Sequence, residues 1–301
     1  HLERFDTLRH DSSDPNSISF DNILGLHESF SGDIWIATDG GGLNRYNPVT
    51  KVNTRYVNDP TNPNSLCSNS VIAVTQDNAS NIWIGTYGGG LCKLSLTTNT
   101  FTHYTLNTQS PEHSLAGEHI FKILINSNQQ IMLSVWRKGL QILDPETGTF
   151  TSYFPVGAGK ESGISNFSIN DIVEDSDGSF WIGGYNGLEH FDPNSQSFTP
   201  VSLHSTDSII DIYLDDNNQV WAASTRGLII YNKETKKVVR YTTEHGLPTD
   251  YIVSIEKDKN GLFWLGTRDG LVHFEPHNKK FTSLTQSDGL TGKNFNRNSH
   301  L

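Results

Sequence analysis

The stretch DNASNIWIGTYGGGLCKL, residues 77–94, decides the fold because it recurs along the chain. It joins a polar turn, a short apolar run with a tryptophan, three glycines and a second apolar run. Six copies occur, and their anchor residues are 40 to 49 positions apart. The anchors are Trp35, Trp83, Met132, Trp181, Trp221 and Trp264. A regular repeat of this length indicates an array of equivalent structural units.

Each copy predicts four short β-strands. In the second copy an apolar run, VIAVTQD (71–77), precedes the polar turn and the tryptophan strand, and the glycines lead into a third strand. A turn then leads to a fourth strand, FTHYT (101–105). Short strands at this spacing, joined by Asn, Asp and Gly turns, predict an all-β fold. A four-stranded unit repeated in tandem is typical of a β-propeller, in which each antiparallel sheet is one blade.

We expect a single domain, residues 1–301, with six complete blades and parts of a seventh. Packing neighbouring blades face to face would bury the tryptophans between them, and closing the ring would remove free sheet edges. Residue 1 is His and not an initiator Met, so we expect a segment of a longer chain. The partial blade is predicted at 2–9 and 288–301 and the complete ones at approximately 17–57, 65–106, 114–154, 166–202, 206–243 and 247–285.

The composition argues against several classes of protein. The formal net charge is −11 and no run of Lys and Arg exceeds two residues, so a nucleic-acid partner is not expected. No apolar stretch approaches the length of about 18 residues that a membrane span needs, and no signal-peptide pattern opens the chain. Two cysteines are too few for a disulfide framework or a zinc site. The favoured interpretation is that Cys67 and Cys92 are buried free thiols, and the alternative is one bridge within a repeat.

No motif predicts a cofactor, a metal site or a catalytic residue. GTYGGGL (85–91) lacks the Lys-Ser/Thr and the helix that follow the glycines of a phosphate-binding loop, so its glycines are predicted to turn the chain between strands. EDSDGSFW (174–181) has the alternating acids of a calcium loop but no distal bidentate acid, which favours a hairpin turn. The 12 histidines show no HxH or HExxH spacing, and no nucleophile motif occurs.

The candidate ligand-binding residues lie in the turns between the second and third strands of the blades. In a propeller these turns share one face with the loops between blades, and we expect them to surround the mouth of the central channel. Aromatic faces and planar bidentate donors suit sugar rings, hydroxyls and carboxylates. The alternative is a solvated loop surface without a ligand. The candidates are Asp39, Tyr87, Trp136, Arg137, Tyr185, Asn186, Arg226, Arg268 and Asp269. Within this set, Arg137, Arg226 and Arg268, together with Lys138, are expected to form a cationic arc.

The repeat resembles the two-component regulator propeller repeat, which runs D..G.IWIGT..GGL...D and then F..Y. The match is full at 77–94 and close at 175–191 and 258–274. The loops RHDSSDPNSIS (9–19) and VNDPTNPNSLCSNSV (57–71) are similar to the HDPNNPNSLS linker between blades of these sensors. The third copy departs most, with Met132 in place of the tryptophan.

This resemblance implies a context. Propellers of this family form the periplasmic sensor part of bacterial membrane receptors, whose output is a histidine kinase, often in a hybrid two-component system, or a diguanylate cyclase. Their known ligands are often oligosaccharides. The expected function is therefore non-catalytic sensing of a small molecule or an oligosaccharide. The expected partners are adjoining domains of the same receptor and a second copy in a homodimer, and the expected location is the periplasm, anchored to the inner membrane.

Two other functions remain open from the sequence. The first is a lyase similar to the streptogramin lyases, which are also propellers. Such an enzyme needs a His with an acidic residue near one channel mouth and a magnesium site, whereas His119, His190 and His273 occupy different strand positions. The second is a protein-interaction scaffold, although the diagnostic dipeptides of WD and kelch repeats are missing.

Overall fold

The computed structural model describes residues 7–156, 163–203 and 207–284 and the single positions 288, 290, 295 and 296. In these residues, 24 strands form six separate four-stranded antiparallel sheets, which confirms the predicted class of all-β propeller blades. The two predicted edges of a seventh blade, 2–9 and 288–301, lie largely outside the described residues. The chain divides into an N-terminal unit, Leu8–Ile169, and a C-terminal unit that begins at Asn170.

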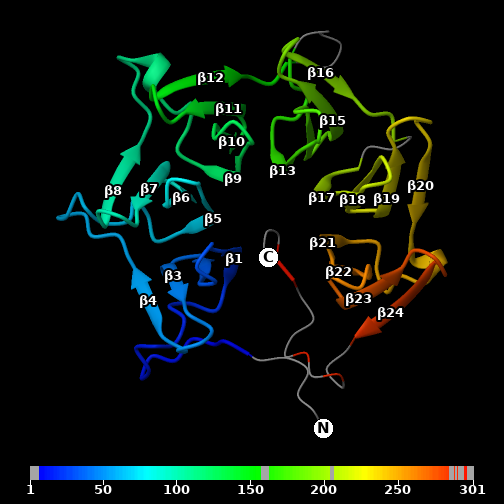
Figure 1. Cartoon of the computed structure of the whole chain (residues 1–301), viewed down its shortest axis with the longest axis horizontal. Coiled ribbons are helices and arrows are strands. Elements are labelled where there is room, and N and C mark those ends of the chain that lie inside the picture. The colour runs from blue at the N-terminus through cyan, green and yellow to red at the C-terminus, as the bar shows by residue number, and fades with distance from the viewer. Residues whose placement is uncertain are drawn as a thin grey trace. The chain divides into compact units, whose positions relative to one another are not determined.

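The N-terminal unit contains blades one, two and three, and the strands of each blade pair in sequence order (Figure 1). Blade two packs between blades one and three, with β5 next to both β1 and β9. Blade one comprises β1 (Ile23–Glu28), β2 (Ile34–Thr38), β3 (Gly42–Tyr46) and β4 (Asn53–Tyr56). Blade two comprises β5 (Val71–Gln76), β6 (Asn81–Thr86), β7 (Leu91–Ser95) and β8 (Thr100–Tyr104). Blade three comprises β9 (Ile120–Ile125), β10 (Ile131–Val135), β11 (Gly139–Asp144) and β12 (Thr149–Tyr153).

The C-terminal unit contains blades four, five and six, built in the same way (Figure 1). Blade four comprises β13 (Ile169–Glu174), β14 (Phe180–Gly184), β15 (Gly187–Asp192) and β16 (Ser197–Pro200). Blade five comprises β17 (Ile209–Leu214), β18 (Gln219–Ser224), β19 (Gly227–Asn232) and β20 (Val238–Tyr241). Blade six comprises β21 (Ile252–Lys257), β22 (Phe263–Thr267), β23 (Gly270–Glu275) and β24 (Lys280–Leu284).

Four of the five anchor tryptophans lie between neighbouring blades, as predicted. In the N-terminal unit Trp35 and Trp83 are fully buried and pack against apolar residues of the following blade. In the C-terminal unit Trp181 and Trp221 do the same, with 4% and 3% of their surface exposed. A sheet with two apolar faces cannot be stable alone, and these rings fill the space that the pairing of blades leaves.

An Asp–Trp hydrogen bond closes the first hairpin of four blades. The indole Nε1 donates to the carboxylate six residues earlier at 2.8 to 3.1 Å. The pairs are Asp77–Trp83, Asp175–Trp181, Asp215–Trp221 and Asp258–Trp264. A buried indole N–H needs an acceptor, so this bond explains why the Asp and the Trp recur together. The hairpin turn predicted for 174–181 is therefore confirmed.

Blades one and three depart from this pairing in different ways. Ser29 stands at the Asp position of blade one, and the buried Nε1 of Trp35 has no hydrogen-bond partner. Blade three replaces both members, with Asn126 and Met132. The side chain of Met132 has no N–H group, so the loss of the carboxylate there leaves no side-chain donor unpaired.

The glycines of GTYGGG connect β6 to β7 and are structural, as predicted. Gly88 has φ 85°, in the left-handed region that favours glycine. A Cβ on Gly89 would lie 2.5 Å from the carbonyl oxygen of Cys67. The turn therefore needs glycine for its backbone shape and for its close approach to the segment before β5.

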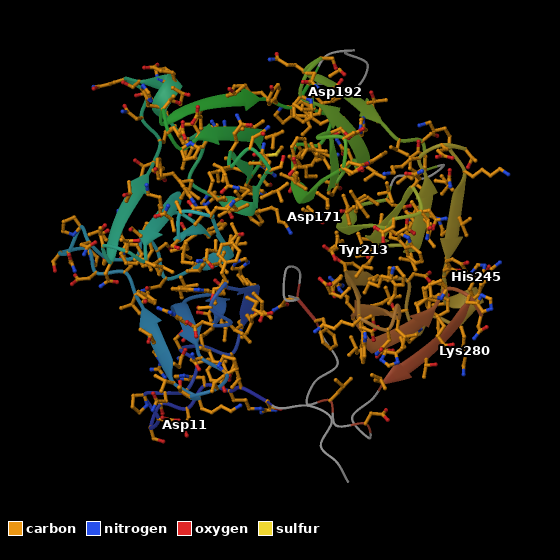
Figure 2. All side chains as sticks on the ribbon, in the orientation of Figure 1. Asp11, Asp171, Asp192, Tyr213, His245 and Lys280 are labelled. Carbon is orange, nitrogen blue, oxygen red and sulfur yellow. A yellow bond between two sulfur atoms is a disulfide. The ribbon has the colours of Figure 1, made fainter. Side chains whose placement is uncertain are left out.

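Buried carboxylates link the inner strands of the C-terminal unit. The Oδ2 of Asp171 on β13 accepts a hydrogen bond from the Ile212 amide of β17 at 2.8 Å (Asp171 is labelled in Figure 2). The Oδ2 of Asp211 accepts one from the Ile255 amide of β21 at 2.7 Å. Each carboxylate therefore joins one blade to the next by a charge-assisted hydrogen bond.

The favoured interpretation of the cysteines was wrong. Cys67 and Cys92 form a disulfide, with their Cα atoms 6.1 Å apart. Two cysteines in a large sequence carry no local signal of pairing. The bond forms because the segment before β5 folds back over β7, a contact that only the folded blade creates.

Candidate functional site

The predicted binding residues all lie in or next to the turns between the second and third strands of their blades. In the N-terminal unit Asp39 follows β2, Tyr87 follows β6, and Trp136 and Arg137 follow β10. The candidates of the C-terminal unit follow β14, β18 and β22; they are Tyr185, Asn186, Arg226, Arg268 and Asp269. The two groups belong to different units and are described separately.

Aromatic side chains gather where blade two meets blade three. The rings of Tyr87 and His119 stack, with centroids 4.0 Å apart and planes inclined by 20°. His119 meets Trp136 edge to face at 5.6 Å, and Phe121 lies 6.4 Å from Trp136. We call these four residues the aromatic platform. Tyr87 is 49% exposed, so the platform faces solvent.

A cation completes the platform. The guanidinium carbon of Arg137 lies 4.9 Å from the centroid of the Trp136 ring, within the range of a cation–π contact. Arg137 is exposed and has φ 59°. A non-glycine residue in this conformation is uncommon and is maintained by its surroundings. The stacked guanidinium keeps its planar donors free to bind hydroxyl or carboxylate oxygens.

Main-chain hydrogen bonds hold the platform rings in place. The Tyr87 amide donates to the Ser70 carbonyl at 2.9 Å, and the Trp136 amide donates to the His119 carbonyl at 2.9 Å. Tyr87 and His119 also form an isolated antiparallel bridge. The platform is therefore built on backbone that crosses from one blade to the next, which restricts the rings before any ligand arrives.

Sequence reasoning weighed His119 only for a lyase and left both His119 and Phe121 out of the binding candidates. Both belong to the start of the third blade's first strand, and only the turns were considered. A signal existed, because His119 immediately precedes β9, whereas Asn22 and Ser70 immediately precede β1 and β5. Ser168 and Ser208 hold the same position before β13 and β17, whereas Tyr251 holds it before β21, so an aromatic ring in this position sets blades three and six apart.

The hydrogen bonds of the Asp39 side chain are made to residues other than those of the platform. Its Oδ1 accepts a hydrogen bond from the Ser70 hydroxyl at 2.6 Å, and its Oδ2 accepts one from the Asn22 amide at 3.4 Å. These bonds join the turn of blade one to the segments that lead into blades one and two. Asp39 therefore has a structural role, whatever it contributes to binding.

The candidates of the C-terminal unit are arranged differently. Arg226 lies 3.7 Å from the buried carboxylate of Asp207, which Arg240 also contacts. The guanidinium of Arg268 stacks 3.7 Å above the ring of Tyr251. Tyr185 is 63% exposed. Two of the predicted cations are thus engaged within their own unit.

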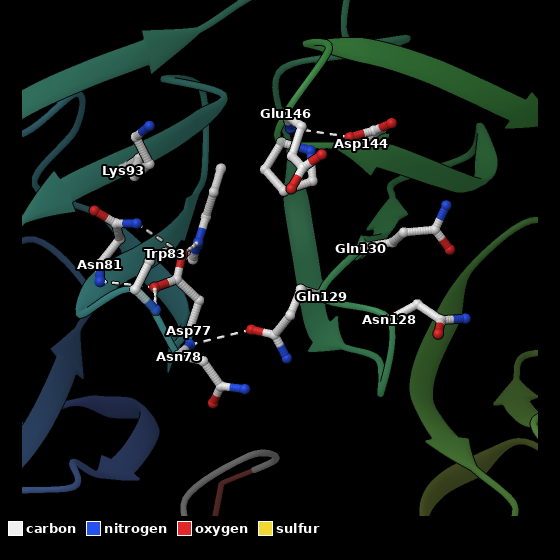
Figure 3. Close-up of a pocket in the computed structure, with 12 residues that line it drawn as sticks. Asp77, Asn78, Asn81, Trp83, Lys93, Asn128, Gln129, Gln130, Asp144 and Glu146 are labelled. Atoms are coloured by element: carbon white, nitrogen blue, oxygen red, sulfur yellow. Dashed lines mark hydrogen bonds between the residues drawn. The ribbon is translucent and has the colours of Figure 1, made fainter.

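A polar groove of about 690 Å³ lies between blades two and three of the N-terminal unit (Figure 3). The first hairpin turns and the ends of the third strands line it, with Asp77, Lys93, Gln129, Asp144 and Glu146 among the side chains. The carboxylate of Asp77 already accepts four hydrogen bonds, from two backbone amides, the Asn81 side chain and the indole of Trp83. Trp83 is fully buried and offers no ring face.

The C-terminal unit has an equivalent groove of about 550 Å³ between blades four and five. Here the ammonium of Lys233 crosses to Asp175, 2.9 Å from Oδ2 and 3.0 Å from Oδ1. Burial raises the pKa of Asp175, but hydrogen bonds from Lys233 and Trp181 outweigh it and hold the pKa below the ordinary value of 3.8. The principal polar groups of both grooves already make hydrogen bonds within the protein that hold the hairpins and blades together. The platform is therefore the stronger candidate site.

Comparison with known proteins agrees with this architecture. Residues 65–88, 162–186 and 246–269 match the family model "Two component regulator propeller". No curated protein matches the chain. The chain therefore carries two-component regulator propeller repeats, as the sequence resemblance predicted.

Solved structures show the same fold. The extracellular domain of the hybrid two component system BT3049 from B. thetaiotaomicron is 23% identical, with a TM-score of 0.77 over 91% of this chain. That of BT4673 from B. thetaiotaomicron is 22% identical, with a TM-score of 0.71 over 87%. This chain covers 37% and 34% of those two domains.

A lyase has the same fold at lower identity. Virginiamycin B lyase from Staphylococcus aureus is 14% identical, with a TM-score of 0.64 over 87% of this chain and 84% of its own. At these identities the likenesses concern the fold alone. In the part of the chain that the structure describes, no helix has the length and apolar character needed to cross a bilayer.

Proposed function

We propose that residues 1–301 form a non-catalytic ligand-sensing domain of a bacterial membrane receptor and that the platform binds an oligosaccharide. The observation that carries this proposal is the cluster of Tyr87, His119 and Trp136 at the boundary of two blades, with Arg137 over the indole. Sugar rings bind through their C–H faces to aromatic rings and through hydroxyls to planar donors.

Other observations support this proposal. The chain carries repeats named for two-component regulators, and its fold is similar to that of extracellular domains of hybrid two component systems. Disulfides persist mainly in oxidising compartments, and Cys67–Cys92 is one. We therefore place the domain in the periplasm, attached to an inner-membrane receptor through adjoining domains of the same chain.

Signalling requires that the ligand bind two arrangements of the receptor unequally. The platform spans two blades, so a ligand that contacts both Tyr87 and Trp136 would favour one spacing of their turns. The change would pass to adjoining receptor domains or to a second copy in a homodimer. A ligand with equal affinity for both arrangements would bind without a signal.

The test is a calorimetric titration of the domain with a panel of neutral and acidic oligosaccharides. For a saccharide that binds, Trp136→Ala should weaken binding at least about tenfold, since loss of one stacking ring removes about 1.4 kcal/mol or more. Phe30→Ala is the matched control, because Phe30 is 71% exposed in the N-terminal unit and lies outside the platform. Silence across the panel, or equal losses in both variants, would overturn the proposal.

A lyase is the second candidate, favoured by the fold likeness that extends over most of a lyase chain. A general base must reach the proton that it removes, and the Nδ1 of His119 is buried without a hydrogen-bond partner. Only Nε2 of His119 could therefore act on a ligand at the platform. Cleavage of a bound compound that His119→Ala abolishes, while binding persists, would establish an enzyme instead of a sensor.

A further inference from the structure

The segment that leads into a blade is attached to the blade's third strand at one repeated position. In blade one, the Ser19 amide donates to the Oδ1 of Asn44 at 2.9 Å, and the Asn44 amide nitrogen donates to the Ser19 hydroxyl at 2.7 Å. In blade three, the Ala116 amide donates to the Oε1 of Gln141 at 2.8 Å. Asn44 and Gln141 occupy the same place, directly after the Gly-Leu pair that begins the third strand.

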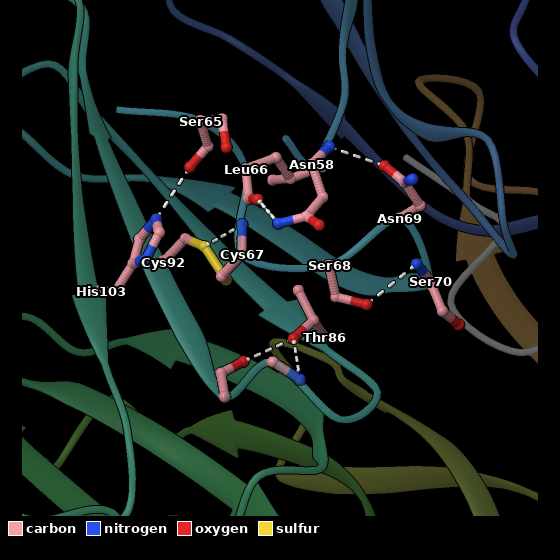
Figure 4. The surroundings of a disulfide bond; sticks show 12 residues. Asn58, Ser65, Leu66, Cys67, Ser68, Asn69, Ser70, Thr86, Cys92 and His103 are labelled. Carbon is pink, nitrogen blue, oxygen red and sulfur yellow. Dashed lines mark hydrogen bonds between the residues drawn. A yellow bond between two sulfur atoms is a disulfide. The ribbon is translucent and has the colours of Figure 1, made fainter. Parts of the chain in front are cut away.

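Blade two makes this attachment covalent. Cys92 follows the same Gly-Leu pair, and it forms the disulfide with Cys67 in the leading segment (Figure 4). Asn44, Cys92 and Gln141 are each almost fully buried. The disulfide therefore replaces, at an equivalent site, a side-chain hydrogen bond of the neighbouring blades.

The residues that follow Cys67 hold the turn that carries Tyr87. The Ser68 hydroxyl donates to the Tyr87 carbonyl at 3.1 Å, and the Ser70 carbonyl accepts the Tyr87 amide at 2.9 Å (Ser68 and Ser70 are labelled in Figure 4). Gly89 in the same turn approaches the carbonyl of Cys67 so closely that a Cβ would clash. The position of this platform ring thus depends on residues 67–70.

The same short segment holds the turn that carries Asp39. The Asn69 carbonyl accepts hydrogen bonds from the amides of Gly40 at 3.0 Å and Gly42 at 2.8 Å. The Ser70 hydroxyl donates to the Asp39 carboxylate at 2.6 Å. Residues 67–70 therefore connect two of the turns predicted to face a ligand, and the disulfide fixes one end of this connection.

We propose that the Cys67–Cys92 disulfide positions the turns of Asp39 and Tyr87 and makes the platform sensitive to thiol reduction. A dithiol reductant breaks the S–S bond and is itself oxidised to a disulfide. The two cysteine sulfurs together take up two electrons and two protons and become thiols. Thiols are weak donors and acceptors, so they do not restore the paired hydrogen bonds that Ser19 and Asn44 make. The effect on ligand binding rests on the function proposed above, whereas the positioning of the turns does not.

The neighbouring blade provides a matched variant. Cys67→Ser with Cys92→Asn installs the Ser19–Asn44 pair of blade one in blade two, so it keeps the attachment without a disulfide. Cys67→Ala with Cys92→Ala removes both forms of attachment. The two double variants differ in the attachment and share the absence of a redox-active bond.

Amide hydrogen exchange in D2O tests the proposal without any ligand. Reduction of the wild type with dithiothreitol should accelerate exchange at Gly40, Gly42 and Tyr87 by about tenfold or more. The Ala double variant should exchange at the reduced rate in either condition. The Ser/Asn double variant should stay close to the oxidised wild type and should not respond to the reductant. Leu133, in the central strand of blade three, is the internal reference and should not change.

Two results would overturn the proposal. One is equal exchange at these amides in oxidised and reduced wild type, a measurement that needs no variant to fold. The other is a Ser/Asn variant that exchanges as fast as the Ala variant. If reduction accelerates exchange but no saccharide binds, the sensor function fails and the positioning role stands. If a saccharide binds, reduction should weaken its affinity severalfold, and an unchanged affinity would refute the redox sensitivity of the platform.

Discussion

The two ends of each blade follow different rules. At the first hairpin, the same Asp–Trp hydrogen bond recurs in four blades, and its residues are largely buried. At the second hairpin, the corresponding turns carry residues as different as Asp39, Tyr87, Trp136 and Arg226. The residues that recur hold neighbouring blades together, because each blade packs against the next in the same way. Variation marks the residues that packing leaves free for recognition.

The largest loss of stability is expected from a change at the first hairpin, where the Asp–Trp pair recurs. Trp83→Ala should lower the free energy of unfolding by about 3–5 kcal/mol, because it empties a fully buried site between blades two and three and removes the hydrogen bond to Asp77. Urea denaturation followed by circular dichroism measures this loss. A loss below about 1 kcal/mol would show that the tryptophan does not hold the blades together.

A smaller effect is expected from the ion pair that crosses the second groove. Lys233→Met should cost about 2–3 kcal/mol at pH 7, since it leaves the Asp175 carboxylate without its ammonium partner. The full 3–5 kcal/mol of a deeply buried pair is not expected, because the Lys233 side chain is 19% exposed.

The effect of Lys233→Met should depend on pH. The folded pKa of Asp175 is lowered, so its contribution to stability is complete well above the ordinary value of 3.8 and is lost as the pH falls through the folded pKa. The difference between wild type and Lys233→Met should therefore shrink below about pH 4. Urea denaturation at pH 7 and at pH 3 checks this, with Lys236→Met as a control. A difference that does not change with pH would rule out the ion pair as its source.

Blade one offers a way to add the missing bond. Ser29→Asp with Asp33→Asn gives blade one the Asp77 and Asn81 pattern of blade two, and it supplies an acceptor for the indole of Trp35. Because it satisfies one buried donor, the double variant should have a free energy of unfolding about 1 kcal/mol higher than that of Asp33→Asn alone. Asp33→Asn alone is the control, because it breaks the ion pair with Arg45 without adding an acceptor. A double variant no more stable than this control would contradict the prediction.

The smallest effect on stability is expected at the second hairpin, whose turn residues differ from blade to blade. Tyr87→Ala should change the free energy of unfolding by less than about 1 kcal/mol, because the ring is 49% exposed and its main contact is the stack on His119. The same denaturation experiment as for Trp83→Ala measures it. A loss as large as that of Trp83→Ala would remove the distinction between the two ends.

Much of the scaffold was predictable because its signals are local. The Asp, the Gly turn and the tryptophan lie within one hairpin, and their spacing repeats. The role of the GTYGGG glycines followed from their place between two apolar runs, and the structure adds that Gly89 approaches Cys67 too closely for any side chain. Such features need only the chain within one blade, so a single sequence reveals them.

The candidate site was predictable only in part. The turns were identified, and Tyr87, Trp136 and Arg137 do come together in one cluster. His119 was left out of the binding candidates because its partner Tyr87 is 32 residues earlier and belongs to another blade. Arg226 was placed in a cationic arc, but the structure engages it with the buried Asp207.

By itself the sequence determined the strands, the turns and the repeated Asp–Trp pairs, because each depends on residues close together in the chain. Only the tertiary structure decided which side chains meet between blades: Tyr87 with His119, Lys233 with Asp175, and Cys67 with Cys92. Side-chain contacts across a blade boundary depend on the distance and angle between two packed sheets, and no spacing within the sequence encodes those quantities.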